Sequence, residues 1–297
     1  MPAITFERLT KHYGQVTALN GLTAEVVPGR ITAFLGANGS GKTTSMRLLL
    51  GFSEPDSGRA TIGGKRYVEL RHPTRRVRAV LDQGFHPNRS ARNHLRIVAA
   101  QAAMPAERAE EVLELVELLP AARRRVGGFS LGMRQRLALA SALVGDPEIL
   151  VLDEPFNGLD PAGIATMRSF LRTFADRGGT VFLSSHLLAE VAHSADDAIV
   201  IHRGRLVSAA PVAELSTSGT GIVVTSDEVD LLGVTLARRG ATVVRTGPNT
   251  LTLTGIDSVT VGRAALDIGA VVRDLHPVGD DMESIFAGLI SRQEATS

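Results

Sequence analysis

Three clusters of residues in this chain have the types and the spacing that phosphate chemistry requires. The first is GANGSGKTT at 36–44, which follows a short apolar run at 30–35. The run predicts a buried strand, and the residues up to about Leu50 predict a helix. Glycines allow the loop between them to turn its N–H groups toward an anion, and the helix start adds a partial positive charge. The segment therefore predicts a phosphate-binding loop.

Two side chains of this loop add a cation and a metal ligand. Lys42, one of only three lysines in the chain, is expected to reach the β- and γ-phosphates of a nucleotide. The Thr43 hydroxyl is expected to ligate Mg²⁺. The nucleotide-binding residues predicted here are Gly36, Asn38, Gly39, Ser40, Gly41, Lys42, Thr43 and Thr44. The alternative is a glycine-rich turn capped by a threonine.

The second cluster is a pair of adjacent acids, Asp153 and Glu154, after the apolar run 149–152. Four successive apolar residues predict a strand buried on both faces, and open α/β sheets bind ligands at the carboxyl ends of such strands. Buried carboxylates are costly unless a cation or a reaction needs them. We expect Asp153 to hold Mg²⁺ through a water, and Glu154 to act as general base on the water that attacks the γ-phosphate. The alternative is a pair of solvated acids at a turn.

The third position is occupied by a single residue, His186, which follows the strand-like run 180–185. Because it follows the two acids in a strand-then-helix setting, we expect His186 to contact the γ-phosphate and orient the attacking water. A histidine on the surface, or one satisfied within the core, is the alternative.

A further segment, FSLGMRQR at 129–136, decides between classes of nucleotide-binding protein. With it, the chain resembles the nucleotide-binding subunit of ATP-binding cassette (ABC) proteins over about residues 4–215. The family signature commonly reads LSGGQ, and this chain departs from it at Phe129, Leu131 and Met133. It keeps Ser130 and Gly132, which in the family face the γ-phosphate held by a second copy of the domain. An FSLGM-like form is familiar among bacterial exporters that resemble bacitracin and lantibiotic resistance pumps.

The resemblance implies roles for other residues. Tyr13 matches the aromatic residue that stacks on adenine, although it could instead pack on the core at a strand end. Asp160 matches the residue that meets the partner subunit. For the family's glutamine loop, one alignment with a single deletion puts Asp82 in the nucleotide- and metal-contacting position, and a slip of one residue puts Gln83 there. We favour Asp82 because some bacitracin-type relatives carry an acid at this position.

The fold class predicted is α/β. It is a P-loop NTPase with antiparallel β and helical subdomains of the ABC type, plus a small C-terminal α+β appendage. The nucleotide-binding domain is expected to span 1–215, with its helical subdomain at about 84–148, where apolar residues have helical spacing. The glycine-, serine- and threonine-rich stretch 216–221 predicts a linker. An accessory domain at 222–297 is expected to end in a helix over Met282–Ile290.

Composition limits the partners. The net charge of +1 argues against nucleic acid binding, and the arginine clusters at 71–78 and 123–125 are typical of solvated faces. Zero cysteines and no recognisable signal peptide suit a cytoplasmic chain. No apolar stretch approaches the ~18–20 residues of a membrane span. We therefore expect a cytoplasmic ATPase that lies on the inner face of the plasma membrane through a separate transmembrane permease.

The mechanism that the resemblance implies is a dimer, with a second copy or a related ATPase, that sandwiches ATP and Mg²⁺ and energises export of a drug, peptide or lipid. Two alternatives stay open, an importer energiser and a non-transport role in translation or DNA repair. Translation proteins of this family carry two cassettes and a basic arm, and repair ATPases insert a long coiled coil before the signature. This chain has one cassette, and the segment between Lys42 and Ser130 is too short for such an insertion.

Overall fold

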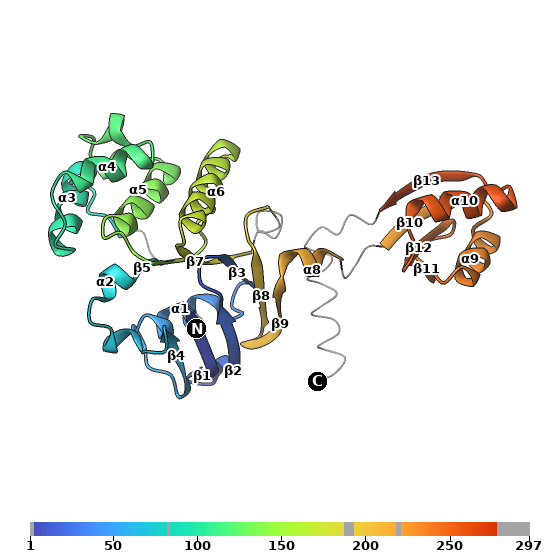
Figure 1. Ribbon diagram of the computed structural model, residues 1–297, viewed down its shortest axis with the longest axis horizontal. Helices are drawn as coiled ribbons and strands as arrows, with labels where there is room; N and C mark the ends of the chain where they lie inside the picture. The colour runs from blue at the N-terminus through green and yellow to red at the C-terminus, as the bar shows by residue number, and fades with distance from the viewer. Residues whose placement is uncertain (1–2, 82–83, 187–192, 218–220, 278–297) are drawn as a thin grey trace. The chain divides into compact units, whose positions relative to one another are not determined.

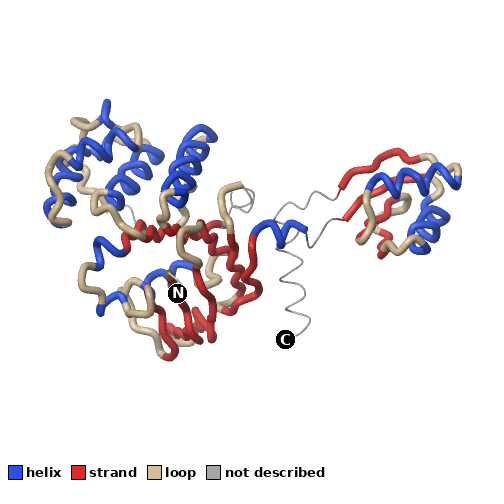
Figure 2. Tube along the Cα trace, viewed as in Figure 1, coloured by secondary structure: helices blue, strands red, loops and turns tan. Residues whose placement is uncertain are grey.

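The chain divides into two compact units, Met1–Ala210 and Pro211–Ser297. The computed structural model describes residues 3–81, 84–186, 193–217 and 221–277. Figures 1 and 2 show the elements of both units.

The first unit is built on a six-stranded sheet with the order β5-β6-β7-β3-β8-β9. Its strands are β5 (Val77–Val80), β6 (Ile149–Leu152), β7 (Thr180–Ser185), β3 (Ile31–Leu35), β8 (Asp197–His202) and β9 (Arg205–Pro211). The pairs β5–β6, β6–β7, β7–β3 and β3–β8 are all parallel. Strands β3, β6 and β7 are buried along their whole length, as expected of parallel strands covered on both faces. Their carboxyl ends therefore meet at one edge of the sheet.

A smaller antiparallel sheet and helix α1 (Lys42–Leu49) lie on one side of this sheet (Figure 1). The smaller sheet has the order β2-β1-β4, from β2 (Val16–Val26), β1 (Ile4–Tyr13) and β4 (Ser57–Ile62). Phe6 of β1 packs against Phe34 of β3 and Phe182 of β7, with ring centroids 5.2–6.3 Å apart. This apolar core between the two sheets fixes the start of α1 relative to the ends of β3 and β7.

Helices α3 (Ala91–Gln101), α4 (Arg108–Leu115), α5 (Leu131–Leu143) and α6 (Pro161–Asp176) lie on the opposite side of the large sheet (Figure 1). The short helix α2 (Pro73–Arg76) precedes β5. Within the helical layer, His94 of α3 lies 3.1 Å from Ser141 Oγ of α5, Nε2 to oxygen, and burial lowers the pKa of His94. The starts of α3, α5 and α6 are capped by Ser90, Ser130 and Asp160, whose side-chain oxygens each accept a backbone N–H three residues later.

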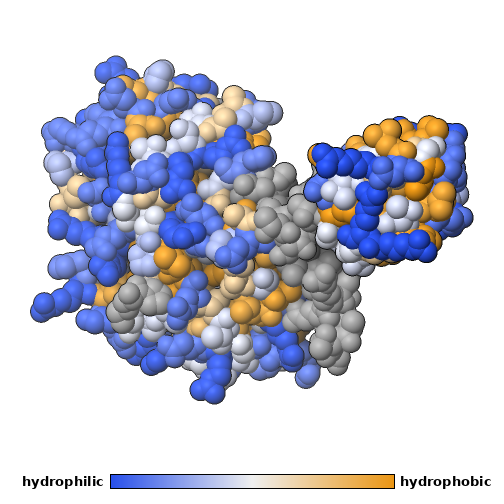
Figure 3. All heavy atoms as spheres, turned by 45° about the vertical axis from the view of Figure 1, so that its right-hand side comes forward, coloured by the Kyte–Doolittle hydropathy of each residue, from blue (hydrophilic) through white to orange (hydrophobic). Residues whose placement is uncertain are grey.

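Residues 221–277 of the second unit have the element order β-α-β-β-α-β, which is the ferredoxin-like arrangement. Its elements are β10 (Gly221–Ser226), α9 (Val229–Arg238), β11 (Thr242–Arg245), β12 (Thr250–Thr254), α10 (Ser258–Ile268) and β13 (Val272–Pro277). The sheet order is β11-β12-β10-β13, with all pairs antiparallel. The unit has its own apolar core and also exposes apolar side chains, which contribute to the orange areas on it in Figure 3.

The predicted fold class is confirmed: an α/β unit with antiparallel and helical parts precedes a smaller α+β unit. Of the predicted linker, residues 216–217 belong to α8 (Val212–Thr217) and Gly221 begins β10, whereas 218–220 lie outside the described residues. The helix predicted over Met282–Ile290 lies outside them as well. Among the described residues, no helix combines the length and apolar character that crossing a membrane requires.

Candidate functional site

The loop between β3 and α1 is shaped by glycines that no other residue could replace. Gly41 has a φ of 110°, and a Cβ there would lie 2.6 Å from the Ala18 carbonyl oxygen. At Gly36 a Cβ would lie 2.7 Å from the Ile201 carbonyl oxygen. The Ser40 carbonyl oxygen accepts the Gly204 N–H at 2.9 Å. The loop is thus packed against β2, β8 and the turn after β8, which fixes the direction of its own N–H groups.

Lys42, the first residue of α1, lies folded over this loop with a side chain that is only 7% exposed. Its Nζ donates to the carbonyl oxygens of Gly36 at 2.6 Å and Ala37 at 3.4 Å, and lies 3.6 Å from Glu154 Oε1. The ammonium group is therefore held at the point where the loop, α1 and the end of β6 converge.

Thr43 and Asp153 meet directly. Thr43 Oγ1 donates to Asp153 Oδ2 at 2.7 Å, and Ser184 Oγ donates to the other carboxylate oxygen, Oδ1. The same Ser184 oxygen accepts the Glu154 N–H at 2.9 Å. One buried hydroxyl near the end of β7 thereby holds the Asp153 carboxylate and the Glu154 backbone.

Glu154 is held between a cation and an imidazole. Its Oε2 lies 2.8 Å from His186 Nδ1 and accepts the His186 N–H at 3.4 Å, while Oε1 faces Lys42. Its backbone has a φ of 50°, a left-handed conformation that costs a non-glycine residue about 1–3 kcal/mol and occurs most often at functional sites. This backbone conformation places the carboxylate beside Lys42, at the predicted phosphate-binding loop.

A cavity of about 240 Å³ opens beside these groups. Its lining combines the loop, the start of α1 and the first residues of β2, and consists of Val16, Ala18, Ala37, Asn38, Gly39, Gly41, Lys42, Thr43, Thr44 and Glu154. Tyr13, at the end of β1, pairs with Val16 in the antiparallel register and is 48% exposed. Tyr13 itself is not among the lining residues, and Lys11 Nζ lies 5.4 Å from its ring centroid.

The remaining predicted residues are placed elsewhere or lie outside the described chain. Ser130, Gly132 and Asp160 are at the starts of α5 and α6 and do not line this cavity. Ser130 Oγ accepts the Met133 N–H at 3.2 Å, and Asp160 Oδ1 accepts the Gly163 N–H at 2.8 Å. Asp82 and Gln83 are not among the described residues. Within one chain, the predicted site is therefore assembled from the phosphate loop, the two acids and His186.

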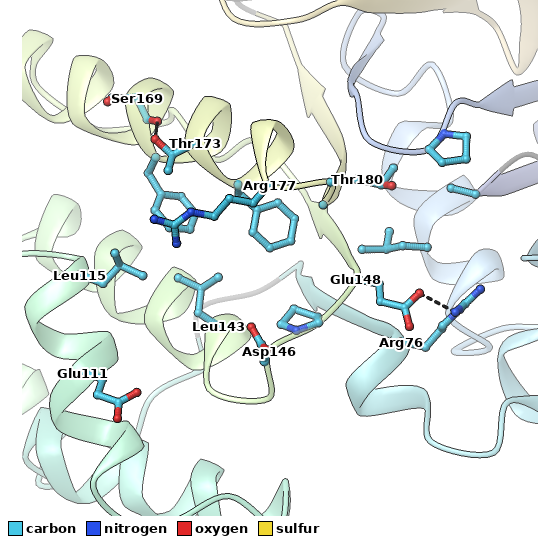
Figure 4. Close-up of a pocket in the computed structure, with 18 of the residues that line it drawn as sticks. Arg76, Glu111, Leu115, Leu143, Asp146, Glu148, Ser169, Thr173, Arg177 and Thr180 are labelled. Atoms are coloured by element: carbon cyan, nitrogen blue, oxygen red, sulfur yellow. Dashed lines mark hydrogen bonds and ion pairs between the residues drawn. The ribbon is translucent and has the colours of Figure 1, made fainter.

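A larger cavity among the described residues of the first unit lies elsewhere. It measures about 1150 Å³ and lies between α6, the ends of α4 and α5, and the amino ends of β6 and β7 (Figure 4). The ion pair between Arg76 and Glu148 forms part of its wall. None of the phosphate-loop residues or the two acids lines it. The volume of a cavity alone therefore does not identify the predicted phosphate site, which is distinguished by its lysine and its two carboxylates.

Ser184 is the functional residue that sequence patterns missed. It is fully buried, and its only signal was a polar side chain directly after the apolar residues 181–183 of β7. Replacing Ser184 with alanine is expected to lower the rate of any reaction that depends on Asp153 and Glu154 by about 10–100-fold, because the Asp153 carboxylate and the Glu154 backbone lose the group that holds them. It also leaves the half-buried Glu154 N–H without this partner, which costs about 1 kcal/mol of stability.

This prediction is checked by steady-state nucleotide hydrolysis and by thermal unfolding of the same preparations. Ser184→Thr, which keeps the hydroxyl, is expected to recover much of the activity. A Ser184→Ala protein that melts earlier but turns over at the original rate would contradict the orienting role.

Comparison with known proteins gives a consistent set of relatives. The sequence profile of a family described as ABC transporter matches residues 19–157. The bacitracin transport ATP-binding protein of Bacillus licheniformis is 42% identical over 70% of this chain and 69% of its own length. The daunorubicin resistance ATP-binding protein of Streptomyces coeruleorubidus is 34% identical over 99% of this chain and 89% of its own length. A solved structure described as the ATP-binding subunit of an ABC transporter aligns with a TM-score of 0.66 and 25% identity, covering 73% of this chain and 92% of that one.

Proposed function

Because this chain belongs to the ATP-binding cassette family of transporter ATPases, we propose that it binds and hydrolyses MgATP as a dimer and thereby drives a separate membrane permease. The observation that carries this proposal is the convergence of Lys42, Thr43, Asp153, Glu154 and His186 at one edge of the sheet, beside the glycine loop 36–41. Cation, metal ligand, acid and imidazole are the groups that phosphoryl transfer to water requires.

The residues present fit a magnesium ion. Mg²⁺ prefers oxygen ligands and is usually held by one or two protein groups together with waters and substrate phosphates. Thr43 Oγ1 and Asp153 Oδ2, 2.7 Å apart, offer a hydroxyl oxygen and a carboxylate oxygen of this kind. No group of three or more acids or histidines that could hold a metal by itself occurs among the described residues, which agrees with a metal shared with the nucleotide. The bound ion would neutralise charge on the β- and γ-phosphate oxygens.

We assign the remaining steps to this chain's own side chains. Lys42 binds the β- and γ-phosphates and exchanges its contact with Glu154 for them. Glu154 accepts a proton from the attacking water, a role worth about 10²–10⁴-fold in rate. His186 holds Glu154 Oε2 through Nδ1, and as an imidazolium it would also donate Nε2–H to the γ-phosphate. Tyr13 stacks on the adenine, a contact worth about 1–3 kcal/mol, and Asp82 or, one residue further along, Gln83 contacts the metal-bound water.

The second half of each site comes from another copy of the chain or a related ATPase. Ser130 and Gly132 are at the start of α5, where N–H groups and the helix dipole favour an anion, and they do not line this chain's own cavity. We propose that they contact the γ-phosphate held by the partner, and that Asp160 meets the partner across the interface. ATP closes the dimer because its terminal phosphate then bridges both subunits, and hydrolysis opens it.

The motion is passed to a permease through the helical layer around 84–92, on the cytoplasmic face of the plasma membrane. We propose export as the direction, because the relatives include proteins named for bacitracin transport and daunorubicin resistance. The cargo class is a drug, peptide or lipid. In this proposal residues 1–215, with the helical subdomain at 84–148, form the nucleotide-binding domain, and the linker 216–221 leads to an accessory domain at 222–297.

The shared site is tested by complementation between two defective chains. Lys42→Ala removes the phosphate-loop cation and keeps the signature, whereas Ser130→Arg does the reverse. Each protein alone is expected to hydrolyse ATP very slowly. A 1:1 mixture is expected to recover up to about a quarter of the original rate, because half of the dimers are mixed and each mixed dimer contains one intact site of two.

Retention of ATP binding by Ser130→Arg, measured by equilibrium titration, shows that this variant is folded and that its own loop is intact. A mixture no more active than the mean of its two components would contradict the shared site. Full activity of Ser130→Arg alone would assign the reaction to a single chain.

A further inference from the structure

Leu131, one of the departures from the family signature, makes a close contact within its own chain. It is the first residue of α5, and 53% of it is exposed. Its side chain covers Gly158, in the loop between β6 and α6. A Cβ at position 158 would overlap Leu131 Cδ2 and lie 2.8 Å from Leu131 Cγ. The two residues are therefore complementary, because the leucine occupies the space that any side chain at 158 would need.

Two neighbouring contacts join the same segments. Leu159 Cδ2 lies 3.4 Å from the point where a Cβ would be at Gly132, so the loop packs on the first turn of α5 a second time. One turn further along α5, the buried Gln135 donates from Nε2 to the Pro155 carbonyl oxygen at 2.9 Å. Residues 155–160 thus contact the start of α5 at three places, and the exposed contact is the one between Leu131 and Gly158.

Loop 155–160 and the start of α5 contain or adjoin three residues with proposed roles. Glu154 immediately precedes the loop, Asp160 ends it as the cap of α6, and Ser130 immediately precedes Leu131. A rigid connection between the loop and α5 fixes the spacing of Ser130 and Asp160, the two residues that face a partner subunit. Fixing a binding surface in its bound arrangement reduces the ordering cost of association.

We propose that Leu131 is a positioning residue that locks loop 155–160 to the signature helix, so that Ser130 and Asp160 meet a second copy of this chain as one preformed surface. The proposal rests on the dimer described under the proposed function. It explains how this chain can carry leucine where the family commonly has glycine. The larger side chain at position 131 fits because position 158 is a glycine and has no side chain.

The test is a double-mutant cycle on ATP hydrolysis and thermal unfolding with Gly158→Ala, Leu131→Ala and the combined variant. Gly158→Ala is expected to lower the ATPase rate about 10–100-fold, because the new methyl group displaces the loop from Leu131. In the combined variant only the Cβ at 131 remains, 3.7 Å from the new methyl group. Most of the lost activity is therefore expected to return. Leu131→Ala alone is expected to raise the protein concentration needed for half-maximal activity about 2–10-fold.

Gly21→Ala is the matched control. Gly21 has the same φ of 72° as Gly158, but a Cβ there would have nothing within 4 Å, so the variant reports left-handed backbone strain alone. Equal impairment of Gly158→Ala and the combined variant would overturn the lock, and so would a Leu131→Ala protein with an unchanged concentration dependence. If the unaltered chain hydrolysed no ATP, the proposed function would fail. The thermal-unfolding cycle would still measure the contact between 131 and 158, and an absence of coupling there would overturn the lock by itself.

Discussion

Replacing Glu154 with glutamine is expected to reduce kcat for MgATP hydrolysis by about 10²–10⁴-fold and to leave ATP bound. The amide cannot accept the proton of the attacking water, whereas its size, backbone conformation and contact with the Ser184 hydroxyl are retained. Glutamine also removes the negative charge that lies 3.6 Å from Lys42 Nζ. Lys42 is then freed for the phosphates, so ATP affinity is expected to stay the same or increase.

The measurement combines single-turnover hydrolysis with the mass of the protein in solution in the presence of MgATP. Because slow hydrolysis leaves the bridging phosphate in place, the variant is expected to accumulate as an ATP-bound dimer, while the unaltered chain returns to monomer. Glu148→Gln is the matched control, since Glu148 precedes the opposite end of β6 and pairs with the exposed Arg76. A Glu154→Gln protein that turns over like Glu148→Gln would remove the general base from the mechanism.

The phosphate loop, the acid pair and His186 could be predicted because each follows a buried strand in the sequence. Strands β3, β6 and β7 are parallel neighbours in the order β6-β7-β3. Residues that follow these strands therefore lie at the same edge of the sheet. The positions of the strands are enough to bring Thr43 to Asp153, and Glu154 to the lysine beside Thr43. The convergence of these side chains could therefore be predicted from residue type and from position after a strand.

Contacts between segments that are distant in sequence could not be predicted in the same way. Ser184 looks like an ordinary polar residue in a strand, and only the register of β7 beside β6 brings its hydroxyl to both acids. Leu131 was recognised as a departure from the signature, but the sequence gives no sign that it covers Gly158. The second unit was predicted as small α+β from strand and helix patterns, whereas its strand order depends on long-range pairing.

The second large effect is expected at Lys42. Lys42→Ala should weaken ATP binding about 10–100-fold, since a charge-assisted hydrogen bond contributes about 1.5–3 kcal/mol. The full electrostatic attraction is not lost, because Lys42 must give up its bond to the Gly36 carbonyl oxygen and its proximity to Glu154 before it binds phosphate. Alanine also removes the ammonium group opposite the half-buried Glu154, so the carboxylate itself would repel the γ-phosphate.

These two contributions can be separated by equilibrium titration with ATP in the Lys42→Ala and Lys42→Ala/Glu154→Gln proteins. If repulsion by Glu154 is part of the loss, the double variant should bind ATP more tightly than Lys42→Ala alone and still less tightly than Glu154→Gln. Lys42→Arg keeps the charge but replaces a compact ammonium in a site only 7% exposed with a wider guanidinium, and it should bind weakly too. If Lys42→Ala bound ATP as tightly as the unaltered chain, the nucleotide would not lie in the glycine loop, and the position of the whole site would have to change.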